Sequence, residues 1–331
     1  MVASETTMRA VLCRRPMKPE AVQAEDAERP AVADDGVLVR VRASSANPVD
    51  LFALSAAGWM LRGRKPVVAG TDFAGTVEAV GAHVTGFRPG DEVFGAARGA
   101  FAEYLSVAED GGVVRKPAAV SFVDAGTLGV AGSTALQALR DHGQVERGQR
   151  VLINGASGGV GSFAVQIAKA LGAEVTAVCS PRNVDLVRSI GADTVIDYSK
   201  DDFARRGERY DLMIDIAGSH SWSDCKRVLT EGGSFVGVGA AALQHGRGGS
   251  LRALGHFLWI RVSTAGGGRR AVALFIAKLR KEDLEFLGEL AASGRVKPVI
   301  ERTYDLSHAG DALAYINAGH TQGKLAIAVG G

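Results

Sequence analysis

Apolar and polar residues alternate in short runs along residues 9–115. The segments 37–41, 74–80 and 101–107 repeat with a period of two, which is typical of half-buried β-strands. Glycine and proline residues interrupt these runs at short intervals, as tight turns require. The pattern predicts a small β-barrel or β-sandwich in the first third of the chain.

The pattern changes near residue 121, where Ser121 is a suitable N-cap for a helix. From there, apolar strands alternate with stretches of helical periodicity. The predicted strands are 150–154, 174–179, 194–196, 211–216 and 234–238, and the predicted helices are 159–171, 183–190 and 221–229. Alternating strands and helices predict a parallel sheet that is covered by helices on both faces.

The segment after Asp283 contains two further helix–strand pairs. We expect a helix that begins there, a strand near 299–304, a helix from Ser307 and a last strand over 324–329. This tail is too short to bury a core of its own. We therefore expect it to return to the N-terminal unit and complete it.

Composition narrows the class of protein. A chain of 331 residues is long for one hydrophobic core, so two packed units are expected. The net charge of +2 gives no reason to expect a nucleic-acid partner. Three dispersed cysteines argue against a disulfide framework and favour a reducing, cytoplasmic setting. We expect neither a signal peptide nor a membrane-spanning helix, because no apolar segment has the required length.

The strand 150–154 runs directly into a glycine-rich turn and then into a helix. Ala156, Gly158 and Gly161 occupy the three glycine places of a G-x-G-x-x-G motif. In dinucleotide-binding folds such a turn lets the backbone approach the pyrophosphate, and the helix N-terminus supplies unpaired N–H groups to it. The candidate cofactor-binding residues of the turn are Ala156, Ser157, Gly158, Gly159 and Val160.

The end of the second predicted strand indicates which nicotinamide cofactor binds. NAD-binding units usually carry an acidic residue there, which accepts a hydrogen bond from the ribose and repels a 2′-phosphate. This chain has Ser180, Arg182 and Asn183 instead, and an arginine contacts phosphate favourably. NADPH is therefore the predicted cofactor. The alternative is that Arg182 and Asn183 only cap the next helix on a solvated loop.

Several ordered motifs resemble those of the zinc-independent quinone oxidoreductase (zeta-crystallin-like) branch of the medium-chain dehydrogenase/reductase superfamily. The similarity covers nearly the whole chain. The matching segments are Asn47-Pro48-Val49-Asp50 (N-P-x-D), Gly70-Thr71-Asp72-Phe73-Ala74-Gly75-Thr76-Val77 (G-x-D-x-x-G-x-V), Gly90-Asp91-Glu92-Val93-Phe94-Gly95 (G-D-x-V-x-G), Gly132-Ser133-Thr134-Ala135 (G-x-T-A) and Gly323-Lys324.

This resemblance implies an α/β protein in which a GroES-like β-barrel catalytic domain accompanies a Rossmann doubly wound parallel-sheet domain. We place the catalytic domain at 1–125 and 272–331 and the cofactor domain at 126–271. The substrate of the family binds in the cleft between the two domains. The resemblance also implies a homodimer.

The resemblance further implies roles for individual residues. Asn47 and Thr134 would lie near the nicotinamide as candidate catalytic residues, and Lys324 would contact the cofactor. The residues around the adenosine 2′-phosphate would be Ser180, Arg182 and Tyr198, and those lining the nicotinamide pocket would be Val238 and Gly239.

Zinc ligands are missing at the expected positions. Alcohol dehydrogenases of the superfamily bind catalytic zinc through Cys, His and Cys, with the histidine in a G-H-E segment. Here that segment reads Gly70-Thr71-Asp72, and no cysteine lies near 47–50 or near Gly132. We predict that no metal is bound. Without a Lewis acid, the favoured substrate is already electrophilic, such as a quinone or an α,β-unsaturated carbonyl compound.

No residue is assigned as the proton donor. Ser55 is interpreted as an ordinary serine on a helix surface, and water or a ribose hydroxyl is left as the proton source.

Between Glu231 and Glu282 the chain has no acidic residue, and arginines and lysines recur throughout. The stretch is interpreted as a lid with solvated arginines. Alternatively, 247–270 contacts an anionic membrane, or the stretch binds the phosphates of an acyl thioester. Three functions thus stay open: an NADPH-dependent quinone or enone reductase, an enoyl-thioester reductase, and a non-catalytic NADPH-binding regulator or scaffold.

Overall fold

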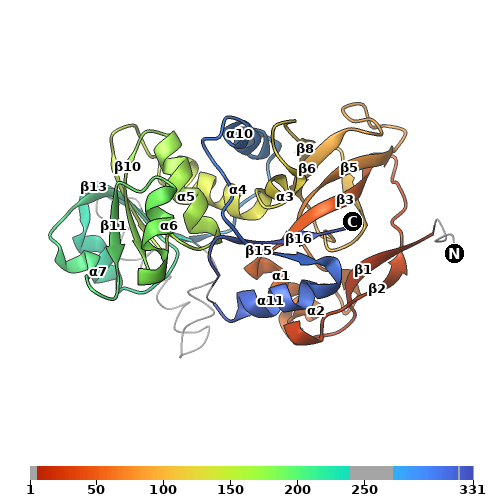
Figure 1. Ribbon diagram of the computed structural model, residues 1–331, viewed down its shortest axis with the longest axis horizontal. Coiled ribbons are helices and arrows are strands. Elements are labelled where there is room, and N and C mark those ends of the chain that lie inside the picture. Colours follow the sequence, from red (N-terminus) through yellow and green to blue (C-terminus); the bar gives the residue numbers. More distant parts are fainter. Residues whose placement is uncertain (1–5, 239–270, 320, 331) are drawn as a thin grey trace. The chain divides into compact units, whose positions relative to one another are not determined.

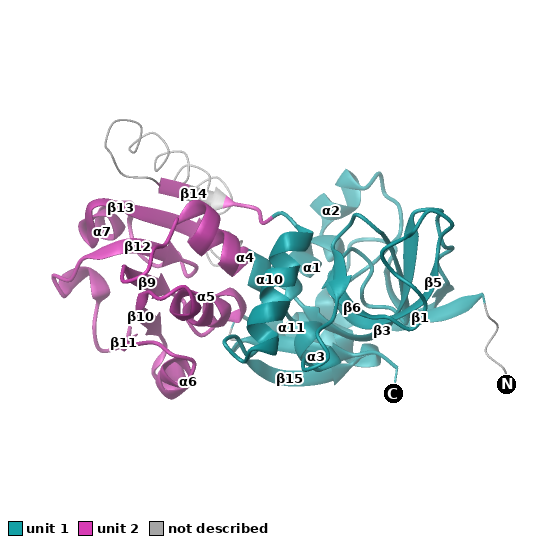
Figure 2. Ribbon diagram, turned by 90° about the horizontal axis from the view of Figure 1, so that it is seen from above, with its two compact units in different colours: residues 1–133, 278–331 teal, residues 134–277 magenta. Residues whose placement is uncertain are grey.

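The computed structural model describes residues 6–238, 271–319 and 321–330 (Figure 1). The chain divides into two compact units, one of residues 1–133 and 278–331 and the other of residues 134–277 (Figure 2). The sequence placed these divisions at 125/126 and 271/272. Among the described residues, no helix combines the length and the apolar character needed to cross a membrane.

The first unit is built around a seven-stranded sheet with the order β15-β16-β3-β5-β6-β8, in which β7 also pairs with β3. A smaller sheet has the order β2-β1-β4. The strands of the large sheet are β3 (Gly36–Ala46), β5 (Asp72–Val80), β6 (Glu92–Ala96), β7 (Tyr104–Ala108), β8 (Val113–Arg115), β15 (Ile300–Asp305) and β16 (Lys324–Ala328). Those of the small sheet are β1 (Thr7–Cys13), β2 (Ala24–Glu28) and β4 (Val67–Val68).

The alternation of apolar and polar residues over 37–41 corresponds to a half-buried β-strand, as predicted. Along β3, Val39 and Val41 are buried in the core, whereas Arg40 and Arg42 are exposed. The helices of this unit are α1 (Pro48–Leu54), α2 (Ala56–Leu61), α3 (Phe122–Ala125), α10 (Lys281–Ala292) and α11 (Ala309–Asn317). Ser121 caps α3 by accepting a hydrogen bond from the Asp124 amide, as predicted.

The strand predicted over 101–107 begins later, at Tyr104. Phe101 is fully buried, its amide donates to the Ala69 carbonyl at 2.8 Å and its carbonyl accepts from the Val11 amide at 2.9 Å. These bonds turn the backbone toward β1 before β7 begins. Ser55 also differs from its interpretation as a surface serine, because it is the N-cap of α2 and accepts from the Gly58 amide at 3.0 Å.

The C-terminal tail returns to the first unit, as predicted. Strand β16 pairs antiparallel with β3, with Leu325 opposite Ala46 and Ala328 opposite Ala43. Leu325 and Ile327 are fully buried in the core of this unit. The first and last parts of the chain therefore share one sheet.

The second unit contains a six-stranded sheet with the order β11-β10-β9-β12-β13-β14, and every pairing in it is parallel. Its strands are β9 (Arg150–Asn154), β10 (Glu174–Cys179), β11 (Thr194–Asp197), β12 (Tyr210–Asp215), β13 (Leu229–Val238) and β14 (Ala271–Phe275). Its helices are α5 (Gly159–Ala170), α6 (Val184–Ser189) and α7 (Trp222–Arg227), together with part of α4 (Gly129–Gln137).

In chain order these strands are arranged 3-2-1-4-5-6, the doubly wound order of dinucleotide-binding domains. The predicted α/β class with a Rossmann-type sheet is confirmed. Ligands of such folds bind beyond the carboxyl ends of the strands, where the strand order reverses. Here the reversal lies between β9 and β12.

Candidate functional site

The glycine-rich turn follows directly from the end of β9. Gly155 has a φ of 93°, in the region that favours glycine, and its amide donates to the Val178 carbonyl at 3.1 Å. A Cβ atom on Gly161 would lie 2.2 Å from the Gly155 carbonyl oxygen. Glycine at 161 therefore allows α5 to pack directly on the turn.

Gly158 stands in a different environment from these two glycines. Its φ of −81° suits any residue, and a Cβ atom there would lie 3.8 Å from the nearest heavy atom, the Gly155 carbonyl oxygen. Neither the backbone conformation nor packing requires glycine at this position. Gly158 is the N-cap residue of α5, so the absence of a side chain there suits the close approach of a dinucleotide pyrophosphate to the first N–H groups of the helix.

The loop after β10 is joined to this turn. Asn183 is 3% exposed, and its side-chain Nδ2 donates to the Ser157 hydroxyl at 2.8 Å. Asn183 precedes α6, but its side chain makes no capping bond to that helix. The amide of Tyr198 donates to the Cys179 carbonyl at 3.2 Å, which brings the chain after β11 to the same end of the sheet.

The structure thus brings most of the predicted cofactor-binding residues of this unit together. Ser180 is half-buried at the end of β10, and Arg182 lies exposed beside Asn183. The side chain of Tyr198 is 63% exposed. Val238 is buried at the end of β13, whereas Gly239 lies outside the described residues.

A hydrogen-bonded group that was not predicted from the sequence lies at the point where the strand order reverses. The Asn154 amide nitrogen Nδ2 donates to Asp215 Oδ1 at 2.9 Å and to the Ser219 hydroxyl at 3.1 Å. The backbone amide of Gly218 donates to the same carboxylate oxygen at 3.0 Å. These bonds join the carboxyl ends of β9 and β12, beside the glycine-rich turn.

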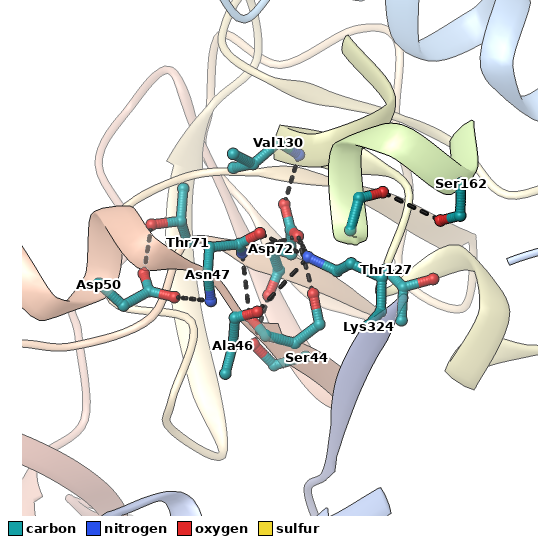
Figure 3. Close-up of polar contacts among 12 residues, drawn as sticks. Ser44, Ala46, Asn47, Asp50, Thr71, Asp72, Thr127, Val130, Ser162 and Lys324 are labelled. Atoms are coloured by element: carbon teal, nitrogen blue, oxygen red, sulfur yellow. Dashed lines mark hydrogen bonds and ion pairs between the residues drawn. The ribbon is translucent and has the colours of Figure 1, made fainter. Parts of the chain in front are cut away.

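In the first unit, Asp72 is the centre of a buried polar cluster (Figure 3). Its carboxylate accepts from the Asn47 side chain at 2.9 Å and pairs with Lys324 at 3.3 Å. It also accepts from the Ser45 hydroxyl at 2.8 Å and from the backbone amide of Val130 at 2.7 Å. The candidate catalytic residue Asn47 and the predicted cofactor-contacting residue Lys324 are therefore both held by one carboxylate.

Lys324 also donates to Asn47 Oδ1, so the three side chains form a closed set of contacts. All three side chains are buried, with Asp72 fully so. A buried cation and a buried anion are costly unless each is paired and hydrogen-bonded, and this cluster meets both conditions. The sequence motifs pointed to Asn47 and Lys324 but assigned no function to Asp72.

A second buried carboxyl lies next to this cluster. Asp50 Oδ2 accepts from the Asn47 backbone amide at 2.7 Å, and Oδ1 accepts from the Thr71 hydroxyl at 2.7 Å. Burial raises the pKa of Asp50 to about 7, although both hydrogen bonds oppose that shift. A carboxyl group with this pKa exchanges protons near neutral pH.

Thr134, the second candidate catalytic residue, is half-buried in α4. It is the first residue of the second unit, whereas Asn47, Asp72 and Lys324 belong to the first. Helix α4 begins in the first unit, where the Val130 amide binds Asp72.

In the part of the chain that the structure describes, no three His, Cys, Asp or Glu residues are grouped so that they can hold a metal ion. Cys13, Cys179 and Cys225 are free and buried. Burial raises the pKa of Cys13 and of Cys179 to about 11. These thiols therefore stay protonated at neutral pH and are weak nucleophiles.

Comparison with known proteins gives matches in both halves of the chain. Residues 33–118 match the family model of the alcohol dehydrogenase GroES-like domain, and residues 190–327 match that of a zinc-binding dehydrogenase. A trans-enoyl reductase of Aspergillus terreus is 34% identical over 322 residues, which cover 89% of this chain and 86% of the relative.

Two further proteins match over similar lengths. A chloroplastic quinone-oxidoreductase homolog of Spinacia oleracea is 34% identical over 309 residues, covering 88% of this chain and 89% of the relative. The solved structure of a quinone oxidoreductase from Coxiella burnetii superimposes with a TM-score of 0.84 at 29% identity, over 98% of this chain and 100% of that one.

Proposed function

The chain belongs to the quinone oxidoreductase-like branch of the medium-chain dehydrogenase/reductase superfamily, and from this we propose that it reduces a quinone or an α,β-unsaturated carbonyl compound with NADPH and without a metal. The family consists of oxidoreductases that bind NAD(P)H. The choice of NADPH, the class of acceptor and the independence from zinc are the parts that we propose.

The observation that best supports NADPH as the cofactor is the hydrogen bond from Asn183 to Ser157. It fixes the loop after β10 against the glycine-rich turn, so Ser180 and Arg182 lie next to the residues that would hold the pyrophosphate. That loop carries a hydroxyl and a guanidinium where an acidic residue would favour NADH. A 2′-phosphate there would gain a charge-assisted contact with Arg182.

The family resemblance assigns different residues to the different parts of the cofactor. In the second unit, the turn 156–160 would bind the pyrophosphate, and Ser180, Arg182 and Tyr198 the 2′-phosphate. The residues that the resemblance assigns to the nicotinamide are Asn47, Thr134, Val238 and Lys324. Bound NADPH supplies a hydride. The protein orients the cofactor and the acceptor and stabilises the oxyanion that forms on the acceptor.

Thr71 and Asp72 support a reaction without zinc. Thr71 stands at the place of the zinc-binding histidine in the alcohol dehydrogenases, and its hydroxyl is bonded to Asp50. Asp72 is paired with Lys324, so a cation already balances its charge. A site without a Lewis acid favours acceptors that are already electrophilic, such as quinones and enones.

The test is steady-state oxidation of NADPH and NADH by menadione and by methyl vinyl ketone, with the metal content of the same sample measured by mass spectrometry. We expect turnover with NADPH, a much higher KM for NADH, and no stoichiometric zinc. Zinc in stoichiometric amount, with activity lost on chelation, would contradict the metal-free reaction.

An enoyl thioester is an alternative substrate, because the chain is similar to a trans-enoyl reductase of Aspergillus terreus. Comparing kcat/KM for a crotonyl thioester with that for methyl vinyl ketone separates the two substrate classes. If neither acceptor nor a panel of quinones oxidises bound NADPH, the chain is an NADPH-binding regulator instead of a reductase.

We also propose that the protein is a cytoplasmic homodimer. The three free, buried cysteines fit a reducing compartment. Cell fractionation and light scattering of the purified protein test these two points. The proposed lid or membrane contact at 247–270 lies outside the described residues, and flotation with anionic liposomes tests the membrane contact.

A further inference from the structure

The roles proposed above leave Asp50 and Thr71 without a function. Asp50 is 2% exposed, in the first turn of α1, and Thr71 directly precedes β5. Of the two groups that are bonded to the Asp50 carboxyl, the Asn47 amide belongs to a buried residue, whereas Thr71 is partly exposed. A proton that leaves Asp50 therefore has the Thr71 hydroxyl as its bonded route toward solvent or substrate.

The two carboxyl oxygens of Asp50 have separate tasks. Oδ2 accepts from the Asn47 amide and completes the N-terminus of α1, which is a purely structural contact. Oδ1 is bonded to the Thr71 hydroxyl, a contact that the helix terminus does not require. The Thr71 contact therefore needs another explanation than helix capping.

We propose that Thr71 and Asp50 form a proton relay that protonates the reduced acceptor, with Thr71 as the donor to the acceptor oxygen and Asp50 as its proton reservoir. The relay rests on the proposed function. It supplies a proton source, which the sequence left unassigned, and it lies beside Asn47, the residue predicted to lie near the nicotinamide (Figure 3).

The proton balance of the step is complete. Hydride addition leaves an enolate or a hydroquinone anion, whose oxygen takes the hydroxyl proton of Thr71. The O–H bond of Asp50 breaks as its proton passes to the Thr71 oxygen, so the threonine is restored and Asp50 becomes a carboxylate. Asp50 then regains one proton from solvent through Thr71 before the next turnover. An enol formed in this way rearranges to the saturated ketone in solution.

The surroundings of Asp50 favour a protonated carboxyl. Burial is the main cause that raises its pKa to about 7, and the nearby negative charge of Asp72 acts in the same direction. Lys324 on β16 and the bonds from Thr71 and Asn47 oppose the shift. The buried thiol of Cys13 on β1 also interacts electrostatically with Asp50. Asp50 therefore carries its proton up to about neutral pH and loses it above.

Thr71→Val in the full-length protein tests the relay, because it removes the hydroxyl and keeps the shape. With NADPH and methyl vinyl ketone, we expect kcat to fall about 10²-fold, the usual contribution of a positioned acid. The KM for NADPH should stay unchanged. The wild-type decline of kcat above about pH 7 and the solvent deuterium isotope effect should both disappear.

Thr71→Ser should restore most of the activity and the pH profile, because it keeps the hydroxyl. Thr303→Val, an exposed position on β15, is the matched control and should behave like the wild type. Should Thr71→Val fail to fold, Asp50→Asn gives a second test, because it removes the proton reservoir and should abolish the decline near neutral pH.

The outcomes separate the two proposals. If wild-type protein reduces the enone while Thr71→Val or Asp50→Asn keeps its rate, pH profile and isotope effect, the relay is wrong and the proposed function stands. If the wild type oxidises NADPH with neither menadione nor methyl vinyl ketone, the reductase function is wrong, and the relay falls with it.

Discussion

Lys324 and Asp72 form an ion pair that is buried on both sides, with Nζ 3.3 Å from Oδ2 and side chains 3% and 0% exposed. It joins β16, the last strand of the chain, to the beginning of β5. Attraction between two buried charges offsets their loss of hydration only while both are present. Removing one partner leaves the other charge uncompensated.

Asp72→Asn should therefore be strongly destabilising. We expect the free energy of unfolding, measured by urea denaturation, to fall by about 3–5 kcal/mol. Combining it with Lys324→Met, which removes the unpaired cation, should recover part of that loss. Arg14→Gln breaks an exposed pair with Glu25 and is the control, with an expected change of about 0–1 kcal/mol. Equal losses of unfolding free energy in Asp72→Asn and Arg14→Gln would show that the buried pair contributes no more to stability than the exposed pair.

Two glycines of the cofactor turn should respond in opposite ways to alanine. Gly161→Ala places a methyl group 2.2 Å from the Gly155 carbonyl oxygen, so α5 must shift and the protein should be destabilised. The methyl group of Gly158→Ala would make only an ordinary van der Waals contact in the fold, so stability should change by no more than about 0.5 kcal/mol. The substitution should nevertheless weaken NADPH binding, because its methyl group occupies the space proposed for the pyrophosphate. Thermal unfolding and NADPH fluorescence titration measure the two effects, and unaltered NADPH affinity in Gly158→Ala would place the pyrophosphate elsewhere.

Arg182→Glu tests the choice of cofactor. A carboxylate beside the 2′-phosphate repels it, so the KM for NADPH should rise much more than the KM for NADH. Arg188→Glu, on the exposed side of α6, is the matched control for the change of charge. A similar increase for both cofactors would show that Arg182 does not contact the 2′-phosphate.

Stability should depend on pH through Asp50. Burial raises the pKa of this carboxyl from 3.8 to about 7 on folding, so the folded state holds the proton more tightly than the unfolded state. Its contribution is fully present below pH 3.8 and is lost progressively as pH rises to about 7, beyond which it stays constant. Asp50→Asn should remove this part of the pH dependence. Urea denaturation at a series of pH values compares the two slopes, and identical slopes would show that folding does not change the pKa of Asp50.

The elements of the second unit were predicted more closely than those of the first. The bounds of β9 and β10 agree with prediction to the residue, because central parallel strands are apolar on both faces and end abruptly at turns. The strand predicted from Phe101 begins late because its backbone bonds to Ala69 and Val11, residues far away in the sequence. Local periodicity contains no information on such pairings.

In the candidate site, too, local sequence patterns predicted some residues, whereas others depend on tertiary contacts. The glycine-rich turn and Arg182 were predicted to bind the cofactor because their spacing along the chain is characteristic. Asp72 was not assigned a function, since its importance depends on Asn47 and Lys324, which tertiary structure brings to it. The bond between Asp50 and Thr71 likewise joins residues that are separated in the sequence and that only the tertiary structure makes neighbours.

The position of β16 beside β3 has a consequence for the order in which the protein can be assembled. The second unit is one continuous segment, whereas the sheet of the first unit stays open until the last strand has been synthesised. On the ribosome, the cofactor-binding unit can fold while Asp72 still lacks its counterion. Nascent chains stalled before residue 324 should therefore resist proteolysis in the second unit and remain sensitive in the first.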